Sequence, residues 1–463
     1  MRSSSGRVRT IILLLTVLIP MLSACSSWTE KSDQQNVILL VIDTLRADHL
    51  GCYGYGRNTS PFLDELSEKA YLFTDVTSQA PWTNPSVVSI LTSLYPSTHH
   101  LLTLRSGGKM KTLSRNITTL AELLKAEGYS TAAFSANPWL VPGIGIERGF
   151  DVFKDLPIKT KANSLHEIAL EWVRRNNTTG QPFFLYIHYM DVHGPYTPPS
   201  PYDTLFTSRI KTGRELSSRE IEIMPGYLRI NGLGTLDEYI GRYDGGIRYW
   251  DECFSVFLEN LSLEGYLKNT ILIVTSDHGE EFLEHDGFNH GSTLFQEQVH
   301  VPLLLRSPDA GGGVIEEPVE LVDIVPSLLS MLGISIPQFL QGNNLVPLLH
   351  GENHILSPVF SEGTVAFGGV PLPGGSFKSV RVGEFKLILN TETGTTKLYD
   401  LSADPGELKK NFDDKSPERA RALAVLRGWM ERSSKAGERY ESGVYDIGKE
   451  LDKNLKALGY VDP

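Results

Sequence analysis

Cysteine, long apolar runs and excess positive charge are all scarce in this sequence. Its 463 residues contain three cysteines, too few for the disulfide frameworks that hold small secreted domains together. The apolar run at residues 11–22 is shorter than the about 20 residues of a comfortable membrane span, and Pro20 interrupts it. The net charge of -12 argues against binding to nucleic acid or to anionic lipid headgroups. We therefore expect a globular protein without a nucleic-acid partner, which holds any anionic ligand through a few dipoles or a metal ion.

Residues 1–24 differ from the rest of the chain and predict an export signal, because arginines and then an apolar run precede small residues and Cys25. The stretch 22–25, Leu-Ser-Ala-Cys, resembles the lipobox of bacterial lipoproteins, whose cysteine is lipidated and becomes the first residue. We therefore expect residues 25–36 to be a tether, with the protein anchored to the cell envelope through a lipid on Cys25. Ser26 matches the outer-membrane sorting pattern of Gram-negative bacteria. An ordinary cleaved secretory signal is the alternative.

Beyond the tether, strand-like and helix-like segments alternate. Four continuous apolar runs have the length of strands that are buried on both faces: 37–43, 131–137, 183–190 and 271–277. Helical patterns lie between them at 60–70, at 118–128 with Gly128 as the stop, and at 247–261. This alternation predicts an α/β domain over residues 37–355, with a mainly parallel sheet flanked by helices.

The composition of the sequence changes after about residue 355. Loops rich in glycine and proline lead into the segments 379–390 and 395–401, which read as a hairpin, and a helical pattern follows at 416–434. We expect residues 356–463 to form a smaller C-terminal subdomain with an antiparallel sheet.

Acidic residues follow two of the predicted buried strands. Asp43 closes the first strand, and Asp277 with His278 closes what we take as the last one. Ligands of open parallel sheets bind at the carboxyl ends of strands, and buried charges need partners or a metal. Asp43 alone could be a helix cap or a turn residue, but the adjacent carboxylate and imidazole predict ligands for Ca, Mn or Zn.

Thr83 lies just before Pro85 at the predicted start of a helix whose apolar face includes Val88 and Leu91. The free N–H groups and the dipole of a helix N-terminus favour an anion. A nearby metal ion would lower the pKa of the threonine hydroxyl and make it a competent nucleophile. An ordinary N-cap threonine is the alternative.

Four segments, in this order, together resemble the sulfatase family of the alkaline-phosphatase superfamily. The resemblance covers most of the chain beyond the signal and rests on NVILLVIDTLRADHLGCYGY (36–55), APWTNPSVVSILTSLYPSTHH (80–100), SDHGEEFLEHDGFNHGSTLFQEQVHVPLLL (276–305) and KLYDLSADPGE (397–407). It implies an alkaline-phosphatase-like fold and a hydrolase that cleaves sulfuric or phosphoric esters of a small molecule, a glycan or a lipid.

The resemblance also assigns roles to single residues. It implies that Asp43, Asp277 and His278 bind a divalent metal ion and that Thr83 is the nucleophile on the same ion. His193 and His290 match positions that bind the transferring group or protonate the leaving oxygen; as lone histidines they could equally be surface loop residues.

Several positions depart from the family pattern. Sulfatases convert a cysteine or serine to formylglycine, and Thr83 cannot form that aldehyde. Val87 replaces the arginine of the motif, the stretch 135–138 lacks two usual contacts to the transferring group, and Thr44 replaces a metal carboxylate. A phosphothreonine is readily hydrolysed in line, so these departures favour phosphate or phosphonate esters over sulfate esters.

Three alternatives remain open. A two-metal phosphodiesterase would use Asp191, His193 and His290 for the second ion. A phosphotransferase would move a phospho-headgroup onto an envelope sugar, although such relatives usually carry several membrane helices. A catalytically dead sulfatase scaffold would be a binding protein.

Overall fold

In the computed structural model, residues 34–463 are described apart from 103–104, 107–108, 159, 177–179, 208–212, 309–310, 353–356, 368–369, 410–415, 447, 449–451, 454 and 456–463. The predicted signal peptide (1–24), Cys25 and most of the tether lie outside the described residues. Within the described part of the chain, no helix is both long and apolar enough to span a membrane.

An eight-stranded sheet forms the centre of the molecule, and all four predicted strands belong to it. In space the strands follow the order β13-β2-β12-β9-β1-β8-β6-β7. They span Asn36–Ile42 (β1), Tyr71–Phe73 (β2), Ser130–Ser135 (β6), Val152–Asp155 (β7), Phe183–Tyr189 (β8), Thr270–Thr275 (β9), Leu303–Arg306 (β12) and Gly313–Ile315 (β13). From β9 to β7 all neighbours are parallel, which confirms a mainly parallel α/β sheet.

The expectation that Asp277 closes the last strand is wrong. Two further strands of the sheet, β12 and β13, come later in the chain, and β12 runs antiparallel to both β9 and β2. Both strands are short, so they lack the long continuous apolar run that marks β1, β8 and β9 in the sequence.

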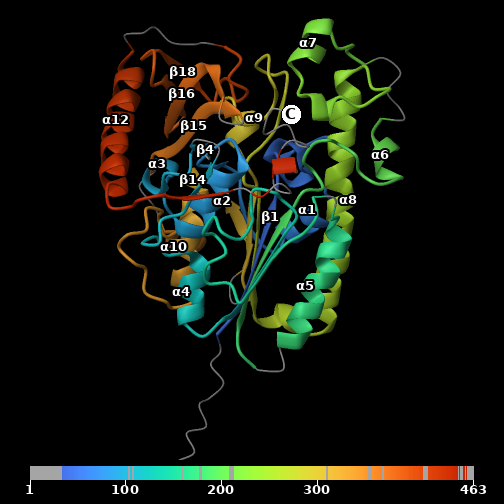
Figure 1. The fold of residues 1–463 in the computed structure, drawn as a ribbon. Coiled ribbons are helices and arrows are strands. Elements are labelled where there is room, and N and C mark those ends of the chain that lie inside the picture. Colours follow the sequence, from blue (N-terminus) through green and yellow to red (C-terminus); the bar gives the residue numbers. More distant parts are fainter. Residues whose placement is uncertain are drawn as a thin grey trace, which may run out of the picture. The chain divides into compact units, whose positions relative to one another are not determined.

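Helices cover the sheet on both sides. They are Pro61–Ser67 (α1), Thr83–Thr92 (α2), Pro96–His99 (α3), Leu120–Ala126 (α4), Ala162–Asn176 (α5), Tyr202–Leu205 (α6), Ser218–Ile223 (α7), Leu236–Leu263 (α8), Gln296–Val299 (α9), Ile324–Met331 (α10), Val346–Leu349 (α11) and Pro417–Gly437 (α12). Figure 1 shows α5 and α8 on one side of β1 and α2, α4 and α10 on the other. The predicted helix at 247–261 is the second half of α8, and the side chains expected to belong to the core are buried: Ile247, Trp250, Phe254, Phe257, Leu258 and Leu261.

A second, antiparallel sheet follows in the C-terminal part, as expected. Its strands pair consecutively and span Val359–Phe367 (β15), Val370–Val382 (β16), Phe385–Asn390 (β17) and Thr396–Asp400 (β18). Trp429 of α12 stacks on Phe360 of β15, with 4.6 Å between the ring centroids, so the helix closes the core of this subdomain. The boundary predicted at residue 355 falls among residues outside the described ranges and stays a prediction.

The remaining strands form small ribbons: β3 (Val76–Thr77) with β14 (Val319–Glu320), β10 (Glu281–Phe282) with β11 (Phe288–Asn289), and β4 (Arg105–Ser106), β5 (Lys109–Thr112) and β19 (Gly443–Tyr445) together. β19 pairs antiparallel with β5. Residues 443–445, which follow the C-terminal subdomain in the sequence, therefore pair with a strand of the larger domain.

Helix α4 has a well-defined beginning and end. The Thr119 hydroxyl accepts a hydrogen bond from the Glu122 N–H at 3.2 Å, and the Glu122 carboxylate accepts one from the Thr119 N–H at 2.9 Å, which is a capping box. Gly128, predicted as the stop, has a φ of 88°. This is the left-handed region of backbone conformation, which residues other than glycine rarely adopt.

Gly128→Ala is expected to lower the free energy of unfolding by about 1–2 kcal/mol, because the left-handed backbone strains an alanine. A Cβ at Gly128 would meet no atom within 4 Å, so the whole loss is conformational. Gly56→Ala is the matched control, since Gly56 has equally open surroundings without a positive φ. Equal urea midpoints for the two variants would contradict this account of the helix end.

Candidate active site

Three neighbouring parallel strands place the central polar residues of the site. Asp43 directly follows β1, and Asp277 follows β9. His188 is the last residue but one of β8. Because β1 pairs in parallel with both β8 and β9, the carboxyl ends of these strands meet at one edge of the sheet. The Asp43 N–H donates to the Tyr189 carbonyl of β8 at 3.0 Å, which fixes the turn after β1 against its neighbour.

The structure brings together the four side chains on which the sequence argument depends. The Thr83 hydroxyl lies 3.5 Å from Asp43 Oδ2 and 3.4 Å from His278 Nε2. His278 Nε2 in turn lies 3.6 Å from Asp43 Oδ1 and 3.5 Å from Asp277 Oδ2. These distances are short enough for one ion to touch all four groups.

The two carboxylates lack sufficient partners of their own. Asp43 Oδ1 and Asp277 Oδ2 are buried and accept no hydrogen bond from any described residue. Burial, together with the negative charge of Asp43, raises the pKa of Asp277 well above its usual range. Burying adjacent negative charges is costly without a cation. The carboxylate and imidazole donors therefore fit a divalent metal ion.

His188 belongs to this cluster, although the sequence argument did not single it out. One ligand atom each from Asp43, His188 and Asp277 lie within 4.8 Å of one another, and all three residues are buried. The Tyr186 hydroxyl and His188 Nδ1 form a 3.0 Å hydrogen bond, which turns Nε2 toward Asp43 Oδ2 at 3.1 Å. A histidine inside an otherwise apolar and aromatic strand was the signal that could have revealed it.

Asn137, which follows β6, supplies a hydrogen-bond donor that the motif comparison had counted as missing. Its Nδ2 lies 2.5 Å from Asp43 Oδ2 and 3.4 Å from the Thr83 hydroxyl. Its Oδ1 accepts a 2.7 Å bond from the Trp139 N–H, so the amide nitrogen faces the site. The stretch 135–138 therefore does contribute a donor beside the Thr83 hydroxyl.

Helix α2 begins at Thr83, and hydrogen bonds attach its first turn to the residues that follow β9. Trp82 occupies the N-cap position without a side-chain cap bond, so Thr83 is not the N-cap residue. The alternative of an ordinary N-cap threonine is therefore wrong, and the Thr83 hydroxyl faces Asp43. The Ser86 hydroxyl donates to the Asp277 carbonyl at 2.6 Å, and Ser78 bonds the same oxygen. These bonds hold the start of α2 against the end of β9.

Thr44 stands where the family has a further carboxylate, and it contacts both acidic residues through its backbone N–H and its hydroxyl. It has a φ of 58°, which is unusual for a β-branched residue. In this conformation its N–H lies 3.3 Å from Asp277 Oδ1 and donates to it, and its hydroxyl donates to the Asp43 carbonyl at 2.7 Å. Thr44 therefore braces both acidic residues.

His193 and His290 are buried beside the cluster, so the alternative of surface loop histidines is wrong. Their ring centroids are 5.2 Å apart, and the ring of His290 lies 4.4 Å from that of His278. His290 Nδ1 bonds Glu280 Oε1 at 2.9 Å. Burial, with the neighbouring His193, lowers the pKa of His290 to about 3, so this imidazole is neutral at physiological pH.

The second metal site considered in the sequence argument does not assemble. Asp191 lies 3.9 Å from Lys161, at the start of α5, and burial raises its pKa to about 6. Within the described ranges, Asp43, His188 and Asp277 form the one group of acidic and histidine side chains whose ligand atoms all lie within 4.8 Å of one another, and Asp191, His193 and His290 do not form such a group. Asp191 is therefore not a partner of His193 and His290.

Comparison with known proteins places this site in a family. A sulfatase family model matches residues 35–334. The chain belongs to the sulfatase family. A second model, for the C-terminal part of N-sulphoglucosamine sulphohydrolase, matches residues 284–427. Family membership makes the chain an ester hydrolase of the sulfatase kind, and its C-terminal antiparallel sheet agrees with the second match.

Individual members are distant relatives. Mouse arylsulfatase K is 26% identical over 467 residues, covering 86% of this chain and 81% of the relative. The phosphonate monoester hydrolase of Agrobacterium radiobacter has the same fold, with a TM-score of 0.68 and 22% identity, covering 88% of this chain and 96% of that one. BT4656, solved in complex with its substrate D-glucosamine-2-N,6-O-disulfate, gives a TM-score of 0.71 at 19% identity, covering 88% and 98%.

His188→Ala is expected to weaken the binding of divalent metal at least about tenfold, because an imidazole within the cluster is lost. Chelator competition with Mn and Zn measures the change. His166→Ala is the control, since His166 is also a buried histidine but bonds Tyr189 away from the carboxylates. An unchanged metal affinity in His188→Ala would remove this residue from the site.

Proposed function

We propose that this chain is a metal-dependent hydrolase of phosphoric, phosphonic or sulfuric esters, with Thr83 as the nucleophile. One observation carries the proposal: the Thr83 hydroxyl stands at the start of α2 within 3.5 Å of Asp43 and 3.4 Å of His278. A threonine at a helix N-terminus, beside two unsatisfied carboxylates, has the surroundings that an activated hydroxyl needs.

A divalent ion held by Asp43, His188, Asp277 and His278 would lower the pKa of the bound hydroxyl and draw negative charge toward it. The residues of the chain supply the remaining steps. The first N–H groups of α2 and the Asn137 amide donate to oxygens of the transferring group as their charge grows. Thr83 loses its hydroxyl proton to solvent and attacks the central atom; the bond to the ester oxygen breaks, and that oxygen leaves as the alcohol with a proton from His193.

His193 and His290 lie beside His278, where the leaving oxygen needs a proton. Because His290 is neutral, we assign it to binding the transferring group and His193 to protonating the leaving oxygen. Glu280 holds Nδ1 of His290, and the Gly194 carbonyl holds Nδ1 of His193 at 2.6 Å. Each ring is therefore fixed through one nitrogen, which orients the other for the substrate. Water then hydrolyses the ester formed on Thr83.

Phosphate or phosphonate esters suit this nucleophile best. The aldehyde hydrate of sulfatases releases sulfate by breaking a C–O bond, a route that a threonine lacks, whereas a phosphothreonine is hydrolysed by attack at phosphorus. The fold shared with a phosphonate monoester hydrolase supports this preference. The sulfated glucosamine bound to BT4656 supports the sulfate alternative and a glycan as the alcohol part.

Thr83→Ala is expected to lower kcat at least about a thousandfold while the metal stays bound, because the attacking oxygen is removed. The measurement uses aryl sulfate, phosphate monoester, phosphodiester and phosphonate substrates with Ca, Mn and Zn, together with the metal content of each protein. Thr92→Ala is the matched control: Thr92 is a buried threonine of the same helix whose hydroxyl donates to the Val88 carbonyl.

Unchanged turnover in Thr83→Ala would remove Thr83 from the mechanism. A protein that binds no divalent metal and cleaves none of the four esters would instead be a binding protein on a sulfatase scaffold. Transfer of phosphate to an added sugar in preference to water would indicate the phosphotransferase.

We also propose that the mature protein is held in the cell envelope by a lipid on Cys25, which rests on the lipobox-like sequence at 22–25. Cys25→Ala is expected to leave the signal uncleaved by the lipoprotein route and to abolish incorporation of labelled palmitate. Ser26→Ala, in the same tether, is the control. Labelling of the Cys25→Ala protein at the level of the unchanged one would favour an ordinary secretory signal.

A further inference from the structure

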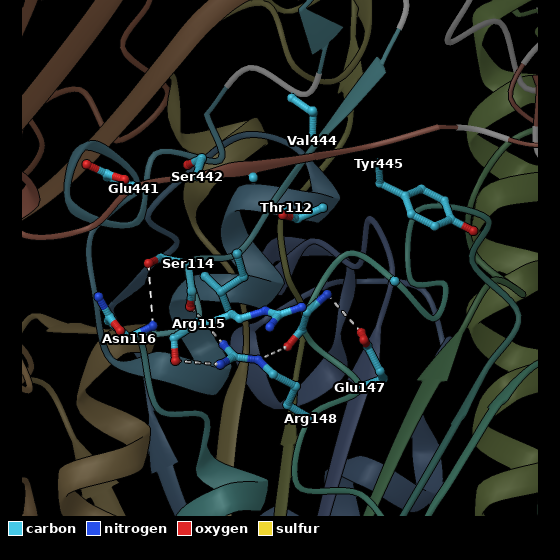
Figure 2. Close-up of a pocket in the computed structure, with 14 residues that line it drawn as sticks. Thr112, Ser114, Arg115, Asn116, Glu147, Arg148, Glu441, Ser442, Val444 and Tyr445 are labelled. Atoms are coloured by element: carbon cyan, nitrogen blue, oxygen red, sulfur yellow. Dashed lines mark hydrogen bonds between the residues drawn. The ribbon is translucent and has the colours of Figure 1, made fainter.

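A second cavity lies apart from the metal cluster and has a different chemistry. It has a volume of about 860 Å³, within the usual range for ligand sites. Figure 2 shows its lining, which comes from the loops at 112–116 and 143–148 and from the strand β19. None of the residues of the metal cluster lines it.

Arg148 makes one wall of this cavity rigid. Its guanidinium donates to the carbonyls of Ile117 at 2.8 Å, Gly145 at 3.0 Å, and Ser114 and Arg115 at 3.1 Å. Because most of its donors are used on the backbone, Arg148 shapes the wall and leaves little capacity for a ligand.

The opposite wall is held by pairing between β19 and β5, with Tyr445 opposite Met110. Tyr445 packs onto Gly143, where a Cβ would come within 2.6 Å of the tyrosine ring, and Gly143 has a φ of 102°. Only glycine fits both the backbone and the ring at this point. The cavity is therefore built on fixed contacts and does not depend on a loose loop.

Two polar groups of the lining have no hydrogen-bond partner. In the part of the chain that the structure describes, the Arg115 guanidinium makes no hydrogen bond or ion pair, and the Ser442 hydroxyl is buried without a hydrogen bond. Asn116, Glu147, Glu441 and the Tyr445 ring also line the cavity, so the Arg115 cation is joined there by an amide, two carboxylates and an aromatic ring; Glu147 accepts a hydrogen bond from the Gly145 N–H. Sugars offer hydroxyls to such polar groups and C–H faces to aromatic rings, and an acidic sugar adds an anion for the arginine.

We propose that this cavity binds an acidic saccharide unit of the substrate, with its carboxylate or sulfate on Arg115. This inference rests on the proposed ester hydrolysis and extends it to an anionic glycan. One chain segment links the two places, since Asn137 lies in the metal cluster and Gly143 lies in the cavity wall. The six Cα–Cα steps from Asn137 to Gly143 span at most about 20 Å. Trp139, on the same segment, packs against Trp82, next to the nucleophile.

Binding of non-hydrolysable acidic sugars tests the cavity without needing turnover. The full chain is titrated calorimetrically with tetragalacturonate, with a sulfated carrageenan tetrasaccharide and with neutral maltotetraose. At least one acidic tetramer is expected to bind, more tightly than the neutral one. Arg115→Ala is expected to weaken that binding at least about tenfold, the loss typical of a charge-assisted hydrogen bond. Arg175→Ala, which removes an exposed arginine at the end of α5, is expected to change nothing.

Turnover gives a second measurement. In Arg115→Ala, KM for an esterified acidic tetrasaccharide is expected to rise about tenfold or more, with kcat unchanged and with KM for a small aryl ester unchanged. A rise for both substrates, equal losses in Arg115→Ala and Arg175→Ala, or no binding of either acidic tetramer would overturn the saccharide site. Arg115-dependent binding in a protein that cleaves no ester would leave the cavity standing and would instead disprove the proposed function.

Discussion

Two buried carboxylates at the ends of adjacent strands impose the main constraint on this structure. Asp43 and Asp277 each keep an oxygen that no described residue satisfies, although both are enclosed by protein. Such a pair repels itself and loses hydration. Neighbouring polar groups offset part of this cost because they contact the two carboxylates. They are the imidazoles of His188 and His278, the amide of Asn137 and the backbone N–H of Thr44. The remaining imbalance has the sign and size that suit a divalent cation.

The same constraint explains the position of the threonine. Helix α2 is buried along its whole length, and hydroxyls from Ser78 and Ser86 attach it to the Asp277 carbonyl. Its first turn therefore cannot shift independently of the acids. The Thr83 hydroxyl is held by the packing of a helix against a sheet, and not by a mobile loop, so its distance to Asp43 is set before any substrate arrives.

Much of this arrangement could be predicted from the sequence, and the misses have clear physical causes. The long strands, and the acidic residues that follow them, could be predicted because a strand buried on both faces has a continuous apolar sequence. The short strands β12 and β13 leave no such run. His188 was hidden inside a strand because its side chain belongs to the interior like its neighbours. The two-metal alternative grouped Asp191 with His193 and His290 by resemblance, but Asp191 is buried beside Lys161 at the start of α5. Motif matching also undervalued Asn137, since an amide can donate to an anion where a relative has a charged side chain.

The pairing of β5 with β19 has a consequence for how the molecule is completed. The first strand is made early in synthesis and the second comes almost at the end of the chain, after both sheets. The catalytic cluster draws only on residues up to His290, whereas the wall bearing Tyr445 exists only once the last segment has docked. The acidic and histidine cluster can thus form without the cavity wall, so loosening β19 from β5 would open the cavity and leave the cluster in place.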